Sequence, residues 1–208
     1  MSRIIRWTAI GLAVAVLAGS AALWLRPGGL DAASRLAAGV ATPGGVQVGG
    51  PFSLVDQTGK PVTQASWPGR WLLIYFGYTY CPDVCPTELQ TIAAALDALG
   101  PRAAQVVPIF ITIDPERDTP ELLAGYVKLF DDRLIGLTGT PQQIAAVARA
   151  YRVYYAKVTP KESTTYLMDH SSFLYLMGPD GTLRMLFDPA TSAQDIAGAI
   201  RTRLPAAS

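Results

Sequence analysis

One short apolar run followed by a thiol motif constrains the fold of this 208-residue chain more than any other feature. The run from Trp71 to Phe76 (WLLIYF) is typical of a strand that is buried on both faces, as in α/β proteins. Shortly after it comes Cys81 to Pro86 (CPDVCP), which contains the chain's only two cysteines. Proteins of this class place reactive groups at the carboxyl ends of strands, where a helix begins. We therefore expect the chemistry of the chain at this turn.

The other apolar runs and turn signals predict a single α/β domain. In chain order they indicate a hairpin at 52–63, the strand at 71–76, a helix at 86–99, a buried strand at 106–113, a helix at 119–130, a strand at 134–137, a helix at 140–151, a strand at 153–158, a hairpin at 172–187 and a helix at 192–204. Pro108 indicates an irregular or edge position for the second buried strand. This order implies a mixed central sheet with helices on both faces, and among such folds the thioredoxin-like one places cysteines at this turn.

The amino-terminal region predicts a membrane anchor. Residues 1–6 form a positive flank with Arg3 and Arg6, and residues 7–25 are apolar and uncharged. As a helix, these roughly 19 residues would extend about 28 Å and cross a bilayer. A cleaved signal peptide is the alternative, because small residues stand at 18–21. The apolar run continues beyond them to Leu25, which favours an uncleaved anchor, and the arginines favour export of the globular part.

Composition sets further limits on organisation and partners. Residues 26–45 are rich in Gly, Ala and Pro and are expected to form a flexible linker, so that the globular domain spans 46–205. The formal net charge of +1 provides no field that would attract nucleic acid. We therefore expect no nucleic-acid partner.

The sequence around the cysteines predicts a reactive thiol. A proline follows each cysteine and disfavours the helical conformation for Cys81 and Cys85, so the helix is expected to begin at Pro86. Cys85 would then lie at or next to the N-cap, where the helix dipole stabilises a thiolate. A purely structural disulfide is a weak alternative, because so small a ring removes little chain entropy.

His170, the only histidine of the chain, stands just before the second predicted hairpin. In a thioredoxin-like fold the loop that enters this hairpin runs close to the cysteine-bearing turn. Two thiols and one imidazole form a soft donor set that suits copper or zinc. Whether Cys81, Cys85 and His170 meet depends on the fold.

Three separated motifs resemble the Sco/SenC family of copper proteins, which serve cytochrome c oxidase assembly. They are Tyr75 to Pro86, Thr112 to Pro120, and Asp169-His170-Ser171 with the turn at 178–181 after it, and the resemblance covers about residues 45–204. The resemblance implies a thioredoxin-like domain tethered to the inner membrane that binds one copper, as Cu(I) or Cu(II), through Cys81, Cys85 and His170. Tyr80 is a small departure that leaves these positions intact.

The resemblance implies two functions. The first is a metallochaperone, not an enzyme in the strict sense, that delivers copper to the dinuclear copper site of cytochrome c oxidase. The alternative is a thiol-disulfide oxidoreductase that keeps the oxidase cysteines reduced, with Cys81 and Cys85 as a redox-active pair that can form a disulfide. A peroxidase is not expected, because the Pro-x-x-x-Thr-x-x-Cys pattern is absent.

The implied partners are the copper-bearing oxidase subunit, a copper donor protein and a thiol reductant such as a thioredoxin-like protein. The implied location is the bacterial inner membrane, with one span and the domain in the periplasm. The alternative is the mitochondrial inner membrane, with the domain facing the intermembrane space.

Several polar residues are further candidates around the site. Asp114, Arg117 and Asp118 come after a neighbouring strand and are expected on the same face as the cysteines, either as part of the site or as a solvated turn. Asp83 and Asp169 flank the ligand positions and are candidates to tune charge or orient His170. Packing on the strand and the rim is expected for three tyrosines: Tyr75, Tyr78 and Tyr80.

Overall fold

The computed structural model of the chain describes residues 47–161 and 165–205. Within these ranges, no helix is both long enough and apolar enough to cross a membrane. The anchor expected at 7–25 and the linker expected at 26–45 lie outside the described residues.

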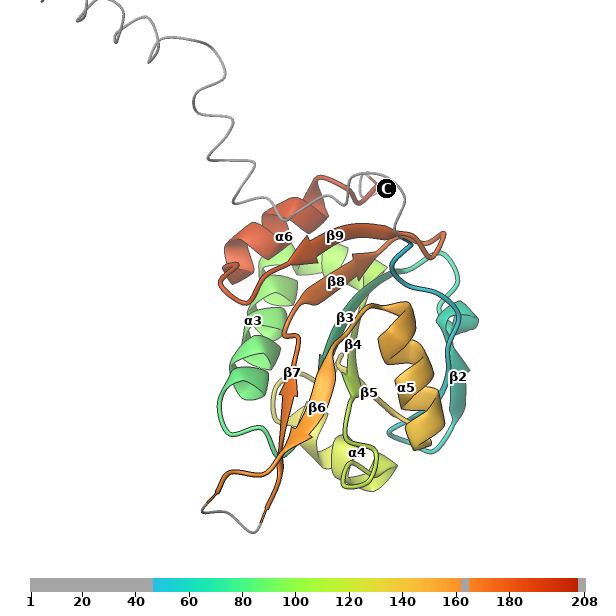
Figure 1. Ribbon diagram of the computed structural model, residues 1–208. Helices are drawn as coiled ribbons and strands as arrows, with labels where there is room; N and C mark the ends of the chain where they lie inside the picture. Colours follow the sequence, from blue (N-terminus) through green and yellow to red (C-terminus); the bar gives the residue numbers. More distant parts are fainter. Residues whose placement is uncertain (1–46, 162–164, 206–208) are drawn as a thin grey trace, which may run out of the picture. The chain divides into compact units, whose positions relative to one another are not determined.

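A seven-stranded mixed sheet forms the centre of the domain (Figure 1). Its three middle strands are parallel, and antiparallel strands flank them on both sides. The order across the sheet is β2 (Pro61–Thr63), β1 (Ser53–Asp56), β5 (Ile135–Thr138), β4 (Val106–Thr112), β3 (Trp71–Gly77), β8 (Leu174–Met177) and β9 (Leu183–Phe187). Every residue of β3 and β4 is buried, as the apolar runs predict. The predicted mixed α/β sheet is confirmed.

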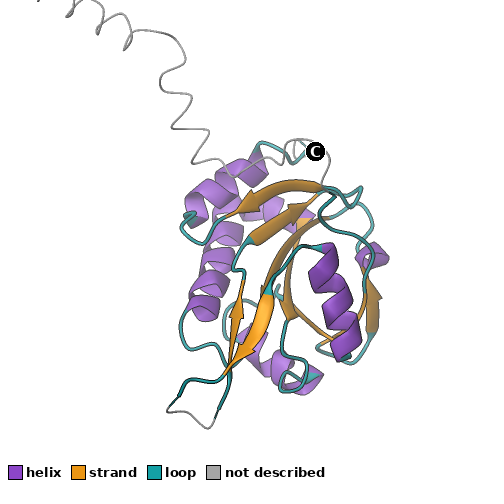
Figure 2. Cartoon of the chain, in the orientation of Figure 1, coloured by secondary structure: helices purple, strands orange, loops and turns teal. Residues whose placement is uncertain are grey.

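Helices cover both faces of this sheet (Figure 2). Neighbouring residues of a strand point to opposite faces: Tyr75 contacts Cys85 at the start of one helix, whereas Phe76 packs on Tyr151, at the end of another. The helices are α3 (Val84–Leu99), α4 (Pro120–Lys128), α5 (Pro141–Ala150) and α6 (Ala193–Arg201), with 3-10 turns at Gln64–Ser66 and Gly100–Gln105. Helices α3 and α6 pack together, and α6 closes the fold after the β8–β9 hairpin, as predicted for a thioredoxin-like domain.

The helices predicted at 119–130 and 140–151 are confirmed as α4 and α5, and each follows a threonine that caps it. The hydroxyl groups of Thr119 and Thr140 accept hydrogen bonds from the amides of Leu122 and Gln143 in the first turns of α4 and α5. Each cap satisfies an amide that has no partner within its helix.

Helix α3 begins at Val84, two residues before the predicted start at Pro86. The first four amides of a helix have no acceptor within it, so a proline at the third position removes no helical hydrogen bond. Cys85 therefore lies inside the first turn of α3 and not at its cap.

Of the two positions predicted for Pro108, the edge strand is wrong, because β4 lies inside the sheet between β3 and β5, whereas the irregular position agrees with the pairing. The ladder between β4 and β5 begins at Ile109, one residue after the proline. Pro108 thus has a partner strand on one side only, and the missing backbone donor is tolerated there.

A strand that the sequence pattern missed carries the histidine. β7 (Leu167–His170) pairs with β6 (Tyr155–Val158) in a separate two-stranded sheet, in which His170 lies opposite Tyr155. His170 is therefore the last residue of a strand and not part of a loop. The strand β7 contains Asp169 and His170, residues with little preference for strands, so its sequence showed no strand pattern.

Candidate metal centre

The cysteine loop connects the end of β3 to the start of α3. At Gly77, a Cβ atom would lie 2.9 Å from both the Cys85 sulfur and a ring carbon of Phe110. Only glycine allows the strand and the helix to approach this closely. The side chain of the N-cap residue Asp83 makes no capping bond, whereas the Cys81 sulfur accepts a hydrogen bond from the Cys85 amide at 3.3 Å. The Cys81 sulfur is therefore held at the amino-terminal end of α3.

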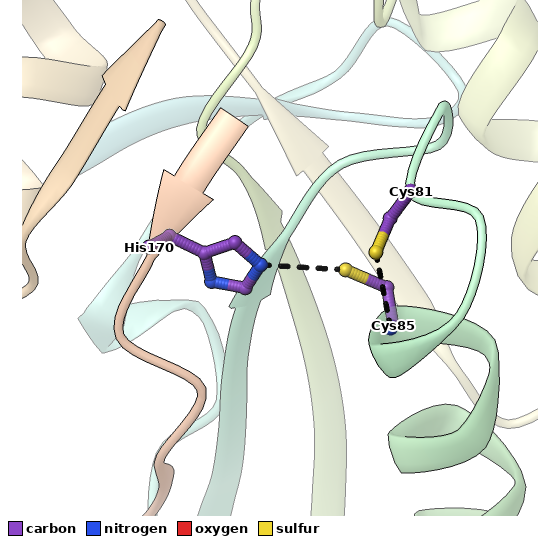
Figure 3. A group of neighbouring side chains, drawn as sticks. All are labelled: Cys81, Cys85 and His170. Atoms are coloured by element: carbon purple, nitrogen blue, oxygen red, sulfur yellow. Dashed lines mark hydrogen bonds between the residues drawn. The ribbon is translucent and has the colours of Figure 1, made fainter. Parts of the chain in front are cut away.

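The β6–β7 hairpin brings the imidazole to these two sulfurs (Figure 3). The Nε2 atom of His170 lies 3.6 Å from the Cys85 sulfur. One ligand atom from each of Cys81, Cys85 and His170 lies within 4.8 Å of the other two. The His170 Nδ1 atom lies 3.0 Å from the carbonyl oxygen of Ser171, which can only accept. A proton on Nδ1 therefore leaves Nε2 as the free ligand atom.

The comparisons with known proteins identify the family of this domain. Residues 40–205 match the sequence model of SCO1/SenC. The chain belongs to the SCO1/SenC family. The human mitochondrial SCO1 homologue is 46% identical over 159 residues, which are 76% of this chain and 53% of that protein. The chain thus spans about half the length of curated relatives that it matches.

Two solved structures give the family a structural reference. Bradyrhizobium japonicum ScoI, solved with copper bound, is 46% identical and has a TM-score of 0.70, with 76% of this chain and 99% of that chain covered. BsSco, described as a cytochrome c oxidase assembly protein with a disulfide switch, is 26% identical, with 78% of this chain and 96% of that chain covered and a TM-score of 0.57.

The two thiols of this SCO1/SenC domain differ in acidity. Hydrogen bonds from the Cys85 thiol and from the backbone amides of Asp83 and Cys85 outweigh partial burial and lower the pKa of Cys81 to about 3. The adjacent Cys81 sulfur and complete burial raise the pKa of Cys85, although the Tyr75 hydroxyl donates to its sulfur at 3.7 Å. In the metal-free reduced state, Cys81 is therefore the more acidic thiol of the two.

This difference predicts selective alkylation. At pH 6, iodoacetamide should modify Cys81 of the reduced, metal-free chain at least about tenfold faster than Cys85, because the thiolate is the nucleophile. Cys81 is partly exposed, whereas the Cys85 side chain is 0% exposed. Timed quenching followed by peptide mass spectrometry measures both rates. Both cysteines should react alike in urea, and equal rates in the folded chain would contradict the assignment.

The loop after β4 is part of the site's support and not a solvated turn. Asp118 is fully buried and accepts hydrogen bonds from the amide of Thr79 at 3.0 Å, the Thr79 hydroxyl at 2.6 Å and the Thr112 hydroxyl at 2.6 Å. Burial nevertheless raises the pKa of Asp118 above its ordinary value. Asp114, also buried, forms an ion pair with Arg117. The expectation that this loop lies beside the cysteines is confirmed.

The two acids that flank the ligand positions lie at the surface of the domain. Asp83 and Asp169 are both exposed. Adjacent strand residues point to opposite faces, so Asp169 points away from the site while His170 points into it. The interpretation of Asp169 as the group that orients His170 is wrong, since the carbonyl of Ser171 has that role.

The tyrosines pack around the site, as expected. The Tyr78 and Tyr75 rings lie edge-on to the His170 ring, with centroids 5.9 and 6.3 Å away. Tyr80 lies on the rim with 55% of its surface exposed. The Tyr75 contact with Cys85 was not expected.

Glu88, a buried carboxyl in α3, was not among the predicted site residues. Burial, followed by the nearby charge of Asp188, raises the pKa of Glu88 to about 7. The sequence signal for Glu88 was its spacing from Cys85, because residues three positions apart lie on the same face of a helix.

Proposed function

We propose that this chain is a copper metallochaperone, which binds one copper ion through Cys81, Cys85 and His170 and delivers it to the dinuclear copper site of cytochrome c oxidase. The observation that carries the proposal is the meeting of three soft donor atoms within 4.8 Å of one another. The copper bound by ScoI supports it, because that relative is 46% identical over nearly its whole solved chain.

The donor set suits an ion that must be both held and released. Thiolates bind Cu(I) well, and the imidazole makes Cu(II) more acceptable. Cys81 and His170 are each partly exposed, so the sulfur of an incoming partner can reach the ion. A closed structural zinc site has four protein ligands, whereas three residues form this cluster.

The second candidate function is that of a thiol-disulfide oxidoreductase. The difference in acidity between Cys81 and Cys85 supports it. The Cys81 thiolate would attack a disulfide of the partner and release one partner thiolate. Cys85, after losing its proton, would attack the Cys81 sulfur and release the second. The pair would lose two electrons and become a disulfide, and the partner would gain two thiols. The disulfide switch described for BsSco supports such a pair.

We also infer that residues 7–25 anchor the chain in a membrane, with 1–6 as the positive flank, 26–45 as the linker and 46–205 as the copper-binding domain. The domain would face the bacterial periplasm or the mitochondrial intermembrane space. A copper donor, a thiol reductant and the oxidase subunit would be its partners there. The mass of the amino-terminal peptide from membranes tests the anchor, and a mature terminus near Ser20 would contradict it.

Copper transfer to an oxidase fragment tests the chaperone function. The chain loaded with one copper equivalent is mixed with the reduced, metal-free copper domain of the oxidase subunit. We expect the absorption of the dinuclear copper site to appear while this chain loses its copper. A parallel sample has the oxidised copper domain and the metal-free, reduced chain. If the chain reduces the disulfide of the oxidised copper domain in the parallel sample and no copper is transferred in the first sample, the reductase function is favoured.

A further inference from the structure

The imidazole ligand lies on an arm with little backbone attachment to the domain. We define the imidazole arm as residues 155–161 and 165–170, which include β6 and β7. Its two strands pair with each other and do not belong to the seven-stranded sheet. An isolated two-stranded hairpin is at best marginally stable in water. Side-chain contacts must therefore determine where this arm, and His170 with it, lies.

Arg117 makes the contacts that join this arm to the cysteine loop. Its Nη1 atom donates to the carbonyl oxygen of Tyr166 at 3.0 Å. Its guanidinium carbon lies 3.8 Å from the centre of the Tyr166 ring and 4.6 Å from the centre of the Tyr80 ring. Tyr166 immediately precedes β7, and Tyr80 immediately precedes Cys81. One guanidinium thus contacts both segments that supply the ligands.

The base from which Arg117 extends is fixed. Asp114 pairs with Arg117 and accepts a hydrogen bond from the Tyr166 hydroxyl at 2.9 Å. Asp118, one residue after Arg117, holds Thr79 of the cysteine loop through its two carboxylate oxygens. The loop from Asp114 to Asp118 is therefore bound to the cysteine loop, and Arg117 with Asp114 extends this support to the arm.

Packing beneath the arm is incomplete, so the position of the arm depends more on its contacts with Arg117 and Asp114. A cavity of about 350 Å³ lies between the loop after β4 and the arm, with Asp114, Glu116, Tyr155, Lys157 and Met168 among its lining residues. An ion pair across this region, Lys157 with Glu116, joins two exposed side chains. Such surface pairs contribute little.

We propose that Arg117 is a positioning residue that clamps the imidazole arm against the cysteine loop and so keeps His170 Nε2 within reach of both sulfurs. A planar guanidinium can stack on two rings and donate in a fixed direction at the same time, which the compact ammonium of lysine cannot. The metal consequence rests on the proposed copper function. Release of the clamp would remove the imidazole and leave the two thiolates, a set that still suits Cu(I).

The test compares Arg117→Lys and Arg117→Met with the unchanged full-length chain in detergent. Without metal, amide hydrogen exchange in the arm should accelerate at least about tenfold, with β3 unchanged, because local opening is not limited by global stability. With Cu(II), affinity should fall roughly 10- to 100-fold and the imidazole contribution to the electron paramagnetic resonance spectrum should decrease. Cu(I) affinity should change less than Cu(II) affinity.

Arg133→Lys is the matched control. Arg133 also contacts two carboxylates, those of Asp97 and Asp131, but it lies before β5, and neither carboxylate belongs to the cysteine loop or to the imidazole arm. It should change neither arm exchange nor the copper spectrum. Tyr166→Phe removes only the hydroxyl contact with Asp114 and should give intermediate exchange.

Unchanged exchange in the arm of both Arg117 variants would overturn the proposal, and so would equal acceleration in β3, which would indicate a general loss of stability. Absence of Cu(II) binding by the unchanged chain would contradict the copper function instead. The exchange measurement on the metal-free chain would still decide the role of Arg117.

Discussion

Replacement of either cysteine by serine should abolish tight copper binding by this chain. A hydroxyl is a hard donor and does not replace a thiolate on Cu(I), so we expect at least about a 100-fold loss of affinity for Cys81→Ser and for Cys85→Ser. The two residues differ in burial and acidity, yet each supplies one of the three atoms that lie within 4.8 Å of one another. Anaerobic titration against a competing Cu(I) chelator measures the loss.

His170→Ala should have a different signature. The imidazole is the ligand that makes Cu(II) acceptable, so its loss should remove the Cu(II) spectrum and leave weaker Cu(I) binding. Asp169→Asn is the matched control, because Asp169 is the neighbouring strand residue and is exposed on the opposite face. An unchanged Cu(II) spectrum in His170→Ala would show that this histidine is not a ligand.

Oxidation of the cysteine pair should prevent copper loading completely. A disulfide uses both sulfur donors, and the remaining imidazole cannot hold the ion alone. Cys81 and Cys85 are free thiols in the structure, with ligand atoms no more than 4.8 Å apart. Loading would therefore depend on a thiol reductant.

The measurement is an anaerobic copper titration of the fully reduced and the fully oxidised chain. The double variant Cys81→Ser/Cys85→Ser is the blank, and the oxidised chain should match it. Treatment of the oxidised chain with a thiol reductant should restore one equivalent of binding. Equal high-affinity uptake by both redox forms would refute this gate and the two-thiolate site with it.

Local sequence signals determined most of the fold and two of the three ligand residues. The apolar runs of β3 and β4 are buried as predicted, and the threonines before α4 and α5 cap them. These features depend on interactions between residues close in sequence, such as a hydroxyl with an amide three positions later. The pairing of Cys81 with Cys85 across one turn is of the same kind.

The predictions that failed each used the average preference of a single proline. The rule that a residue before proline avoids helix placed the start of α3 at Pro86, whereas the helix begins at Val84 and includes the proline in its first turn, where no helical hydrogen bond is lost. Pro108 indicated an irregular or edge position. Its strand is internal, but the pairing with the short strand β5 begins only at Ile109, so the proline has no partner on that side. In both cases a propensity was correct on average and was overridden by the local hydrogen-bond pattern.

The sequence by itself determined the thiol motif, the mixed sheet and, through three motifs, the family. Only the tertiary structure decided that His170 ends a strand, that its Nε2 atom lies 3.6 Å from the Cys85 sulfur, and that Arg117 contacts its arm. The same holds for the raised pKa of Glu88 and the opposite shifts of the two thiols. The physical reason is that these properties depend on burial and on contacts between residues tens of positions apart, which have no periodicity along the chain.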